Sequence, residues 1–122
     1  MAVGTLWSVT LDCAEPGPLA QFWAAMLDGT VAFESDGFVA VETPGGTWVG
    51  AYKIDDYEPP RWPESGGNKQ FHLDLAVSDL DTAEKAAEAL GAVKAGHQPN
   101  ADTFRVLFDP AGHPFCLTTA TA

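Results

Sequence analysis

The sequence predicts an α+β fold made of two tandem βαβββ modules. Three observations support this: short runs alternate apolar and polar residues, two segments have the apolar spacing of amphipathic helices, and the order strand, helix, three strands occurs twice. A stretch rich in proline and glycine separates the two passes. We place the modules at about residues 5–54 and 69–120, with a linker or lid at 55–68, in a single domain of 122 residues.

The first module begins with an alternating segment, residues 6–13, which predicts a strand with one apolar face. A helix is expected next, because apolar residues recur at positions 19, 22, 23, 26 and 27, and Asp28-Gly29 ends it. Strands are expected at 30–34, 37–42 and 47–53, separated by turns that contain glycine.

The second module repeats this order. Residues 70–77 alternate, Ser78-Asp79 caps a helix at about 80–90, and Gly91 ends it. Strands are expected at 92–95, 104–108 and 113–119, and the turn Asp109-Pro110-Ala111-Gly112 joins the last two.

The two halves align with a nearly constant offset. Ser8 corresponds to His72, 64 residues later, and the turn that begins at Thr43 corresponds to the turn that begins at Asp109, 66 residues later. An internal repeat explains this alignment. The alternative is that both halves obey the same general rules for a βαβββ order without common origin.

The composition restricts the partners. The chain has 17 acidic and 6 basic residues, for a net charge of −11, which disfavours nucleic acid and anionic membranes and favours a neutral or cationic small molecule. The N-terminus lacks the pattern of a signal peptide, so we expect a cytoplasmic protein whose Cys13 and Cys116 are reduced thiols.

Three segments resemble a known family in their order and spacing. They are V-T-L-D-C-A-E-P at 9–16, F-H-L-D-L-A-V-S-D-L at 71–80 and F-D-P-A-G-H-P-F-C-L at 108–117. Together they resemble the vicinal-oxygen-chelate superfamily, in its glyoxalase-like and bleomycin-resistance branch. The resemblance implies an incomplete β-barrel that forms a cup, with the helices outside and a ligand inside. It also implies a homodimer, because in many relatives two chains complete one cup.

The alternation assigns side chains to the two faces of this barrel. The residues expected under the helices are Trp7, Val9, Leu11, Phe71, Leu73, Leu75 and Val77. The residues expected to face the cup are Ser8, Thr10, Asp12, His72, Asp74 and Ala76.

Metal-dependent members of the superfamily bind a divalent ion through four positions, which correspond here to Ser8, Gly50, His72 and Cys116. Glycine has no side chain and a serine hydroxyl is a poor ligand, so we expect no metal and no cofactor. The alternative is a set that adds Asp12 and Asp74 to His72. Carboxylates two residues further along a strand, however, lie roughly 6–7 Å away from the usual positions.

Other residues are candidates for contact with a ligand. Trp48 and Tyr52 flank Gly50 on the cup face, and the glycine would leave room for a flat molecule. Trp62 would close over the ligand from the lid, and Arg105 would bind a carboxylate. The alternative readings are that the rings fill an empty cup and that Arg105 faces solvent. Cys116 is expected to be a small buried apolar residue.

Two functional hypotheses follow. The first is a binding protein without a catalytic metal that holds a small aromatic or cationic organic molecule, as drug-sequestering or metabolite-binding proteins do. The alternative is an enzyme of the lyase, isomerase or dioxygenase-like kind that uses His72, with or without a divalent metal. A biosynthetic pocket that acts by shape and hydrogen bonds alone is a third possibility.

Overall fold

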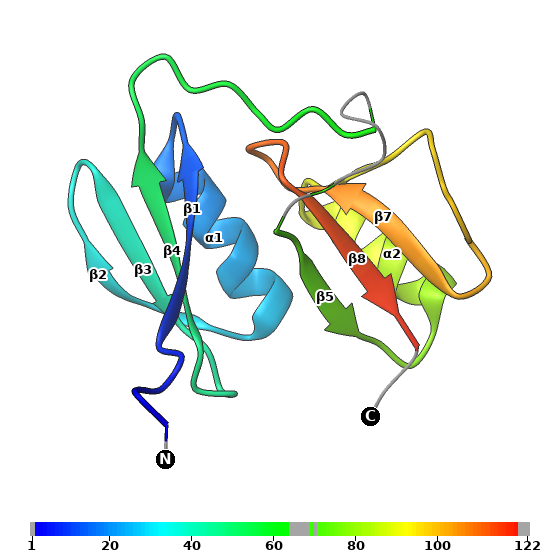
Figure 1. Cartoon of the computed structure of the whole chain (residues 1–122), viewed down its shortest axis with the longest axis horizontal. Helices are drawn as coiled ribbons and strands as arrows, with labels where there is room; N and C mark the ends of the chain where they lie inside the picture. Colours follow the sequence, from blue (N-terminus) through cyan, green and yellow to red (C-terminus); the bar gives the residue numbers. More distant parts are fainter. Residues whose placement is uncertain (1, 64–68, 70, 120–122) are drawn as a thin grey trace. The chain divides into compact units, whose positions relative to one another are not determined.

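The computed structural model describes residues 2–63, 69 and 71–119, and the chain divides into two compact units, Met1–Glu58 and Pro59–Ala122 (Figure 1). The first unit contains β1 (Ser8–Cys13), α1 (Pro16–Leu27), β2 (Thr30–Glu34), β3 (Phe38–Glu42) and β4 (Trp48–Lys53). The second contains β5 (Leu73–Ala76), α2 (Leu80–Leu90), β6 (Val93–Lys94), β7 (Phe104–Phe108) and β8 (Pro114–Thr118). The predicted α+β fold of two βαβββ modules is confirmed.

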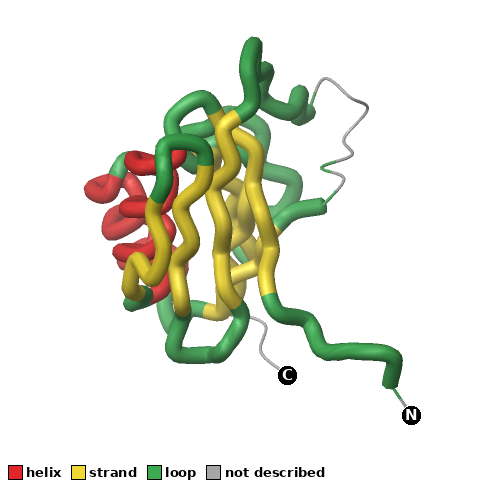
Figure 2. The backbone as a smooth tube through the Cα atoms, turned by 90° about the vertical axis from the view of Figure 1, so that its left-hand side faces the viewer, coloured by secondary structure: helices red, strands yellow, loops and turns green. Residues whose placement is uncertain are grey.

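The two sheets have the same topology. Their strand orders are β1-β4-β3-β2 and β5-β8-β7-β6, and in each sheet the first and last strands of the module pair in parallel while the other pairs are antiparallel. In each unit the helix packs against one face of its own sheet; Figure 2 draws the helices in red and the strands in yellow. The other face of each sheet is not covered by the helix of that unit, so a functional site is expected there.

Local sequence signals set the ends of both helices. Pro16 occupies the first turn of α1, where its missing N–H costs nothing, and Asp28 ends the helix in the left-handed region with φ 55°. The Asp79 carboxylate caps α2 by accepting the backbone N–H of Thr82 at 2.8 Å, and Gly91 ends α2 with φ 117°. Within the described residues, no helix has the length and apolar character needed to cross a membrane.

Each helix buries an apolar stripe against its sheet. In the first unit the stripe comprises Leu19, Phe22 and Trp23, and the β3 and β4 core comprises Val39, Val41, Val49 and Ala51. In the second unit the largest fully buried side chains are Phe115, Leu107 and Leu117. Cys13 and Cys116 are both buried, and neither is in a disulfide, as expected.

The turn between β7 and β8 is held by a buried carboxylate. Asp109 is 3% exposed and accepts the backbone N–H groups of Ala111 at 3.0 Å and His113 at 2.9 Å. Gly112 has φ 88°, a region that favours glycine, and a Cβ there would lie 2.7 Å from Pro59 Cβ. This turn sets the pairing of β7 with β8 and hence the side chains that share a face.

Two residues expected under the helices are instead exposed. Trp7 lies before β1 with 66% of its surface exposed, and its ring packs against Trp48 with 5.6 Å between centroids. Phe71 lies before β5 and is fully exposed. Both predictions were wrong because the strands begin later than the alternation suggests, at Ser8 and Leu73, so the rings lie outside the paired region. Gln70, placed in the same predicted strand, lies outside the described residues.

Candidate functional site

In the first unit, the strand register places the predicted residues on the face opposite α1. Paired residues share a face, and the register pairs Ser8 with Trp48, Thr10 with Gly50 and Asp12 with Tyr52. Val9 and Leu11 pair with Val49 and Ala51, which are buried on the helix side. The predicted alternation of β1 is confirmed.

The space above Gly50 is filled by another side chain. A Cβ built on Gly50 would lie 2.8 Å from Cε1 and 3.0 Å from Cζ of Phe38, and 3.0 Å from Oγ1 of Thr10. Phe38 reaches this place because β3 pairs Phe38 with Tyr52 and Ala40 with Gly50 on the same face. The expected room for a flat molecule between Trp48 and Tyr52 is therefore occupied by the protein's own ring.

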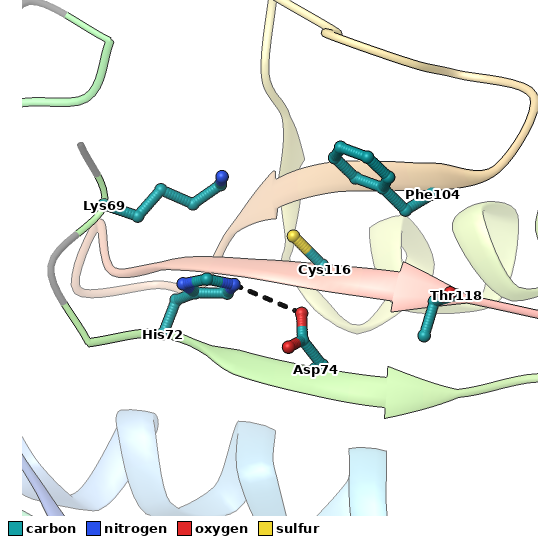
Figure 3. A pocket seen from close by; sticks show the side chains of 6 residues that line it. All are labelled: Lys69, His72, Asp74, Phe104, Cys116 and Thr118. Carbon is teal, nitrogen blue, oxygen red and sulfur yellow. Dashed lines mark ion pairs between the residues drawn. The ribbon is translucent and has the colours of Figure 1, made fainter. Parts of the chain in front are cut away.

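The second unit has an open pocket of about 420 Å³ on the face of its sheet opposite α2 (Figure 3). The register brings its strand residues together, because β5 pairs Asp74 with Cys116 and β7 pairs Phe104 with Thr118. The lining residues are Lys69, His72, Asp74, Phe104, Cys116 and Thr118. Three of the predicted site residues, His72, Asp74 and Cys116, thus line one pocket.

His72 and Asp74 form a close pair on one side of this pocket. His72 Nε2 lies 3.2 Å from Asp74 Oδ1, with side-chain exposures of 27% and 61%. The Asp74 carboxylate oxygen and this ring nitrogen face each other (Figure 3). The pair therefore offers an exposed carboxylate beside an imidazole.

Cys116 lies at the base of the pocket and is only 3% exposed. Burial raises the pKa of its thiol to about 11; the Lys69 charge acts in the opposite direction, and the Asp74 charge and hydrogen bond add to the rise. At neutral pH the thiol is therefore protonated. This state disfavours a nucleophilic role, which requires a thiolate.

Trp62 belongs to the core of the second unit. It is 4% exposed and packs with Ala95, Val106 and Cys116, and its ring lies 5.5 Å from that of His97 and 6.2 Å from that of Phe108. The predicted role as a movable lid residue is not what the structure shows. Trp62 is buried because its large apolar ring packs into the core. Its segment has no periodicity, so local sequence patterns could not predict this burial.

Arg105 lies on the opposite face of β7 from the pocket. Its guanidinium Nη1 contacts Asp81 Oδ1 at 2.8 Å and Glu84 Oε1 at 3.2 Å on α2, and its Nε donates to the carbonyl of Ala101. The hydrogen bond to Asp81 is the main cause that raises the pKa of Arg105. Arg105 therefore connects the sheet to α2, and the expected contact with a ligand carboxylate does not fit its position.

Three pocket residues were missed by the sequence reasoning: Lys69, Phe104 and Thr118. Phe104 and Thr118 share a face with Cys116, which the β7–β8 pairing across the turn at 109–112 would have indicated. Lys69 follows a stretch of sequence without periodicity, so no periodic signal pointed to it.

The four positions that hold a metal in the superfamily do not fit that role here. Gly50 has no side chain and its space is taken by Phe38, and Ser8 offers a half-buried neutral hydroxyl. His72 and Cys116 are the two ligand-type side chains among the four. This donor set is too small for a tight site.

Comparison with solved structures supports the fold. A possible glyoxalase from Bacillus cereus is similar over 96% of this chain and 99% of its own, with 13% identity and a TM-score of 0.69. A mutant of the fosfomycin resistance protein FosX from Listeria monocytogenes, in complex with Mn(II) and 1S,2S-dihydroxypropylphosphonic acid, is similar over 99% and 93%, with 16% identity and a TM-score of 0.73. A glyoxalase/bleomycin resistance protein/dioxygenase family enzyme from Burkholderia phytofirmans is similar over 93% and 97%, with 16% identity and a TM-score of 0.70.

A search of curated proteins found no match. The family model of the glyoxalase-like domain matches residues 8–118, from the start of β1 to the end of β8. With both βαβββ modules inside this match, the chain belongs to the glyoxalase-like domain family.

Proposed function

We propose that the second unit binds a small aromatic, cationic organic molecule directly through the side chains of its pocket. The observation that supports this is the exposed His72–Asp74 pair, which lines the same pocket as the ring of Phe104. A ring provides a surface for stacking, and a carboxylate accepts N–H donors and attracts a cation. The volume of about 420 Å³ falls within the range of roughly 300–1,000 Å³ that is typical of ligand pockets.

The charges support a cation over an anion. Asp74 is 61% exposed toward solvent, and the whole chain carries a net charge of −11. Lys69 also lines the pocket, but its Nζ lies 5.0 Å from the centre of the Trp62 ring, a cation–π contact that already engages its charge. The protonated Cys116 thiol favours reversible binding over covalent capture.

The experiment is a titration with three small probes of the same shape, followed by NMR in the presence of a chelator. The probes are benzylamine, benzyl alcohol and benzoate. Benzylamine should bind most tightly. Asp74→Asn should weaken the affinity for benzylamine about fivefold, because an exposed charge pair contributes about 1 kcal/mol. The affinity for benzyl alcohol should not change. Phe104→Leu should weaken both.

The matched control is Asp36→Asn, which removes the same charge from an exposed loop of the first unit. It should leave all three affinities unchanged. Tightest binding of benzoate would assign the selectivity to Lys69 and contradict the proposal. Chemical shift changes that avoid the residues of the pocket would also contradict it.

A proton-transfer enzyme is the second candidate, because the Asp74 carboxylate lies 3.2 Å from the His72 ring, and an imidazole is the commonest general base. Dihydroxyacetone in D₂O is a simple probe, since a base would exchange the hydrogens next to its carbonyl. This candidate predicts exchange above the buffer rate that His72→Gln abolishes. Hydrogen exchange no faster than in buffer alone would contradict the enzyme candidate and favour the binding function.

A further inference from the structure

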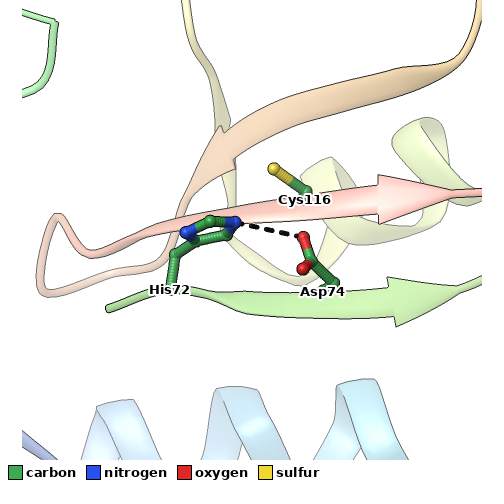
Figure 4. Close-up of side chains that lie close together, drawn as sticks. All are labelled: His72, Asp74 and Cys116. Atoms are coloured by element: carbon green, nitrogen blue, oxygen red, sulfur yellow. Dashed lines mark ion pairs between the residues drawn. The ribbon is translucent and has the colours of Figure 1, made fainter. Parts of the chain in front are cut away.

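Three side chains of the second unit converge on one point of the pocket (Figure 4). A nitrogen of His72, a carboxylate oxygen of Asp74 and the sulfur of Cys116 all lie within 4.8 Å of one another. Asp74 and Cys116 are direct partners across the parallel β5–β8 pair, and His72 comes from the segment just before β5.

Asp74 lies two residues beyond the position expected for a ligand, but its side chain closes the distance. Alternate residues of a strand are separated by roughly 6–7 Å along the backbone. The His72 and Asp74 side chains lean toward each other, so that their nearest atoms are 3.2 Å apart. The backbone spacing of two residues therefore does not prevent His72 and Asp74 from forming a cluster.

We propose that His72, Asp74 and Cys116 form a site for one divalent ion of intermediate softness, such as Zn²⁺ or Co²⁺, held entirely by the second unit. Imidazole, carboxylate and thiolate are all ligands of zinc, and the sulfur selects against Mg²⁺ and Mn²⁺. Binding of the ion displaces the proton of the Cys116 thiol into solvent, and the resulting thiolate and the Asp74 carboxylate would balance the charge of the ion. This set differs from the four positions of the superfamily, because it includes Asp74 and needs neither Ser8 nor Gly50.

The geometry requires only small adjustments. In a tetrahedral site with the usual bond lengths, ligand atoms are about 3.5 Å apart. The His72 nitrogen and the Asp74 oxygen are already 3.2 Å apart, and atoms separated by up to 4.8 Å must approach by roughly 1.3 Å. Cys116 is fixed in the core, whereas the side chains of His72 and Asp74 are partly exposed and can rotate. The remaining coordination position would face the pocket. If the proposed function holds, that position is where a donor atom of the organic molecule would bind; the ion site itself does not depend on it.

The test is a titration of the chelator-treated full chain with Co²⁺ alone, followed by absorption spectroscopy. We expect one ion per chain, visible bands of tetrahedral intensity and a near-ultraviolet charge-transfer band from the thiolate. Cys116→Ser should abolish the charge-transfer band, and His72→Gln and Asp74→Asn should each weaken binding at least tenfold. Millimolar Mg²⁺ should not compete.

Cys13→Ser is the matched control, because Cys13 is the other buried cysteine and lies in the first unit. It should keep the full spectrum. Absence of the charge-transfer band in the unmodified chain, or equal affinity in Asp74→Asn, would overturn the proposal. Asp74 is exposed, so its variant should fold even if Cys116→Ser does not. Benzylamine binding with chelator but no Co²⁺ binding would overturn the ion site alone, and the reverse result would overturn the proposed function alone.

Discussion

The ring of Phe38 lies directly over the backbone of Gly50 in the first unit. The Cε1 atom of Phe38 would be 2.8 Å from a Cβ at position 50, closer than real Cβ contacts allow. Ala40 and Gly50 are paired on this face and are both buried, although α1 packs on the opposite face. Phe38 thus covers the part of the sheet that the sequence suggested would hold a ligand.

We predict that Gly50→Ala destabilises the chain by about 1–3 kcal/mol, the usual effect of overpacking, as measured by urea unfolding. The added methyl group forces the Phe38 ring to move. Phe38→Leu should remove most of the penalty when the two substitutions are combined. Gly37→Ala is the control, because a Cβ there meets nothing within 4 Å. An equal penalty for Gly50→Ala with and without the Phe38→Leu substitution would show that the ring is not responsible.

Trp62→Ala should lower the free energy of unfolding by about 3–5 kcal/mol, because it removes a large buried ring from the core of the second unit. A lid residue would instead change ligand affinity with little effect on stability. Trp7→Ala is the comparison, since that ring is 66% exposed and its loss should cost under about 1 kcal/mol. Similar losses for the two variants would argue against a core role for Trp62.

The Cys116 thiol predicts a loss of stability at alkaline pH in the metal-free chain. Its pKa is raised from 9.0 to about 11, so the folded chain keeps the proton at pH values where the unfolded chain releases it. This contribution is fully present below pH 9 and is lost as the pH rises through about 11. Urea unfolding from about pH 8 to 11 should therefore show a steeper decline in the unmodified chain than in Cys116→Ser. Parallel curves would contradict the assignment.

Asp109→Ala should destabilise the second unit by about 1–3 kcal/mol, because it removes the carboxylate that accepts the N–H groups of Ala111 and His113. Asp109→Asn should recover part of the loss, since its carbonyl oxygen can still accept. Asp102→Ala removes an exposed carboxylate from the turn before β7 and should have little effect. Thermal unfolding of the three variants measures the difference.

Local signals predicted the regular elements well. The boundaries of α2 agree with its Asp79 cap and its Gly91 terminus, and β2 spans the expected residues 30–34. Side chains outside regular elements were not predictable: Trp7 and Phe71 were assigned to strands that begin after them. Arg105 was assigned to solvent or ligand because alternation gives the face of a strand but not the partners that α2 supplies.

The residues of the candidate site were predictable from the sequence, but the contacts between their side chains were not. The sequence placed His72, Asp74 and Cys116 on one face, which the register supports. It treated Asp74 as too distant from His72, because the spacing along a strand says nothing of how two side chains bend. The Phe38 ring over Gly50 was missed for a related reason, since it depends on which residues two separate strands bring opposite each other.

The length of the turn at 109–112 has an evolutionary consequence. Because neighbouring residues of a strand face opposite ways, inserting one residue there would slip β8 against β7 and exchange its faces. Cys116 and Thr118 would leave the pocket, and Phe115 and Leu117 would enter it. Point substitutions in the pocket can therefore vary its chemistry gradually across descendants, whereas a single insertion in this turn would erase it in one step.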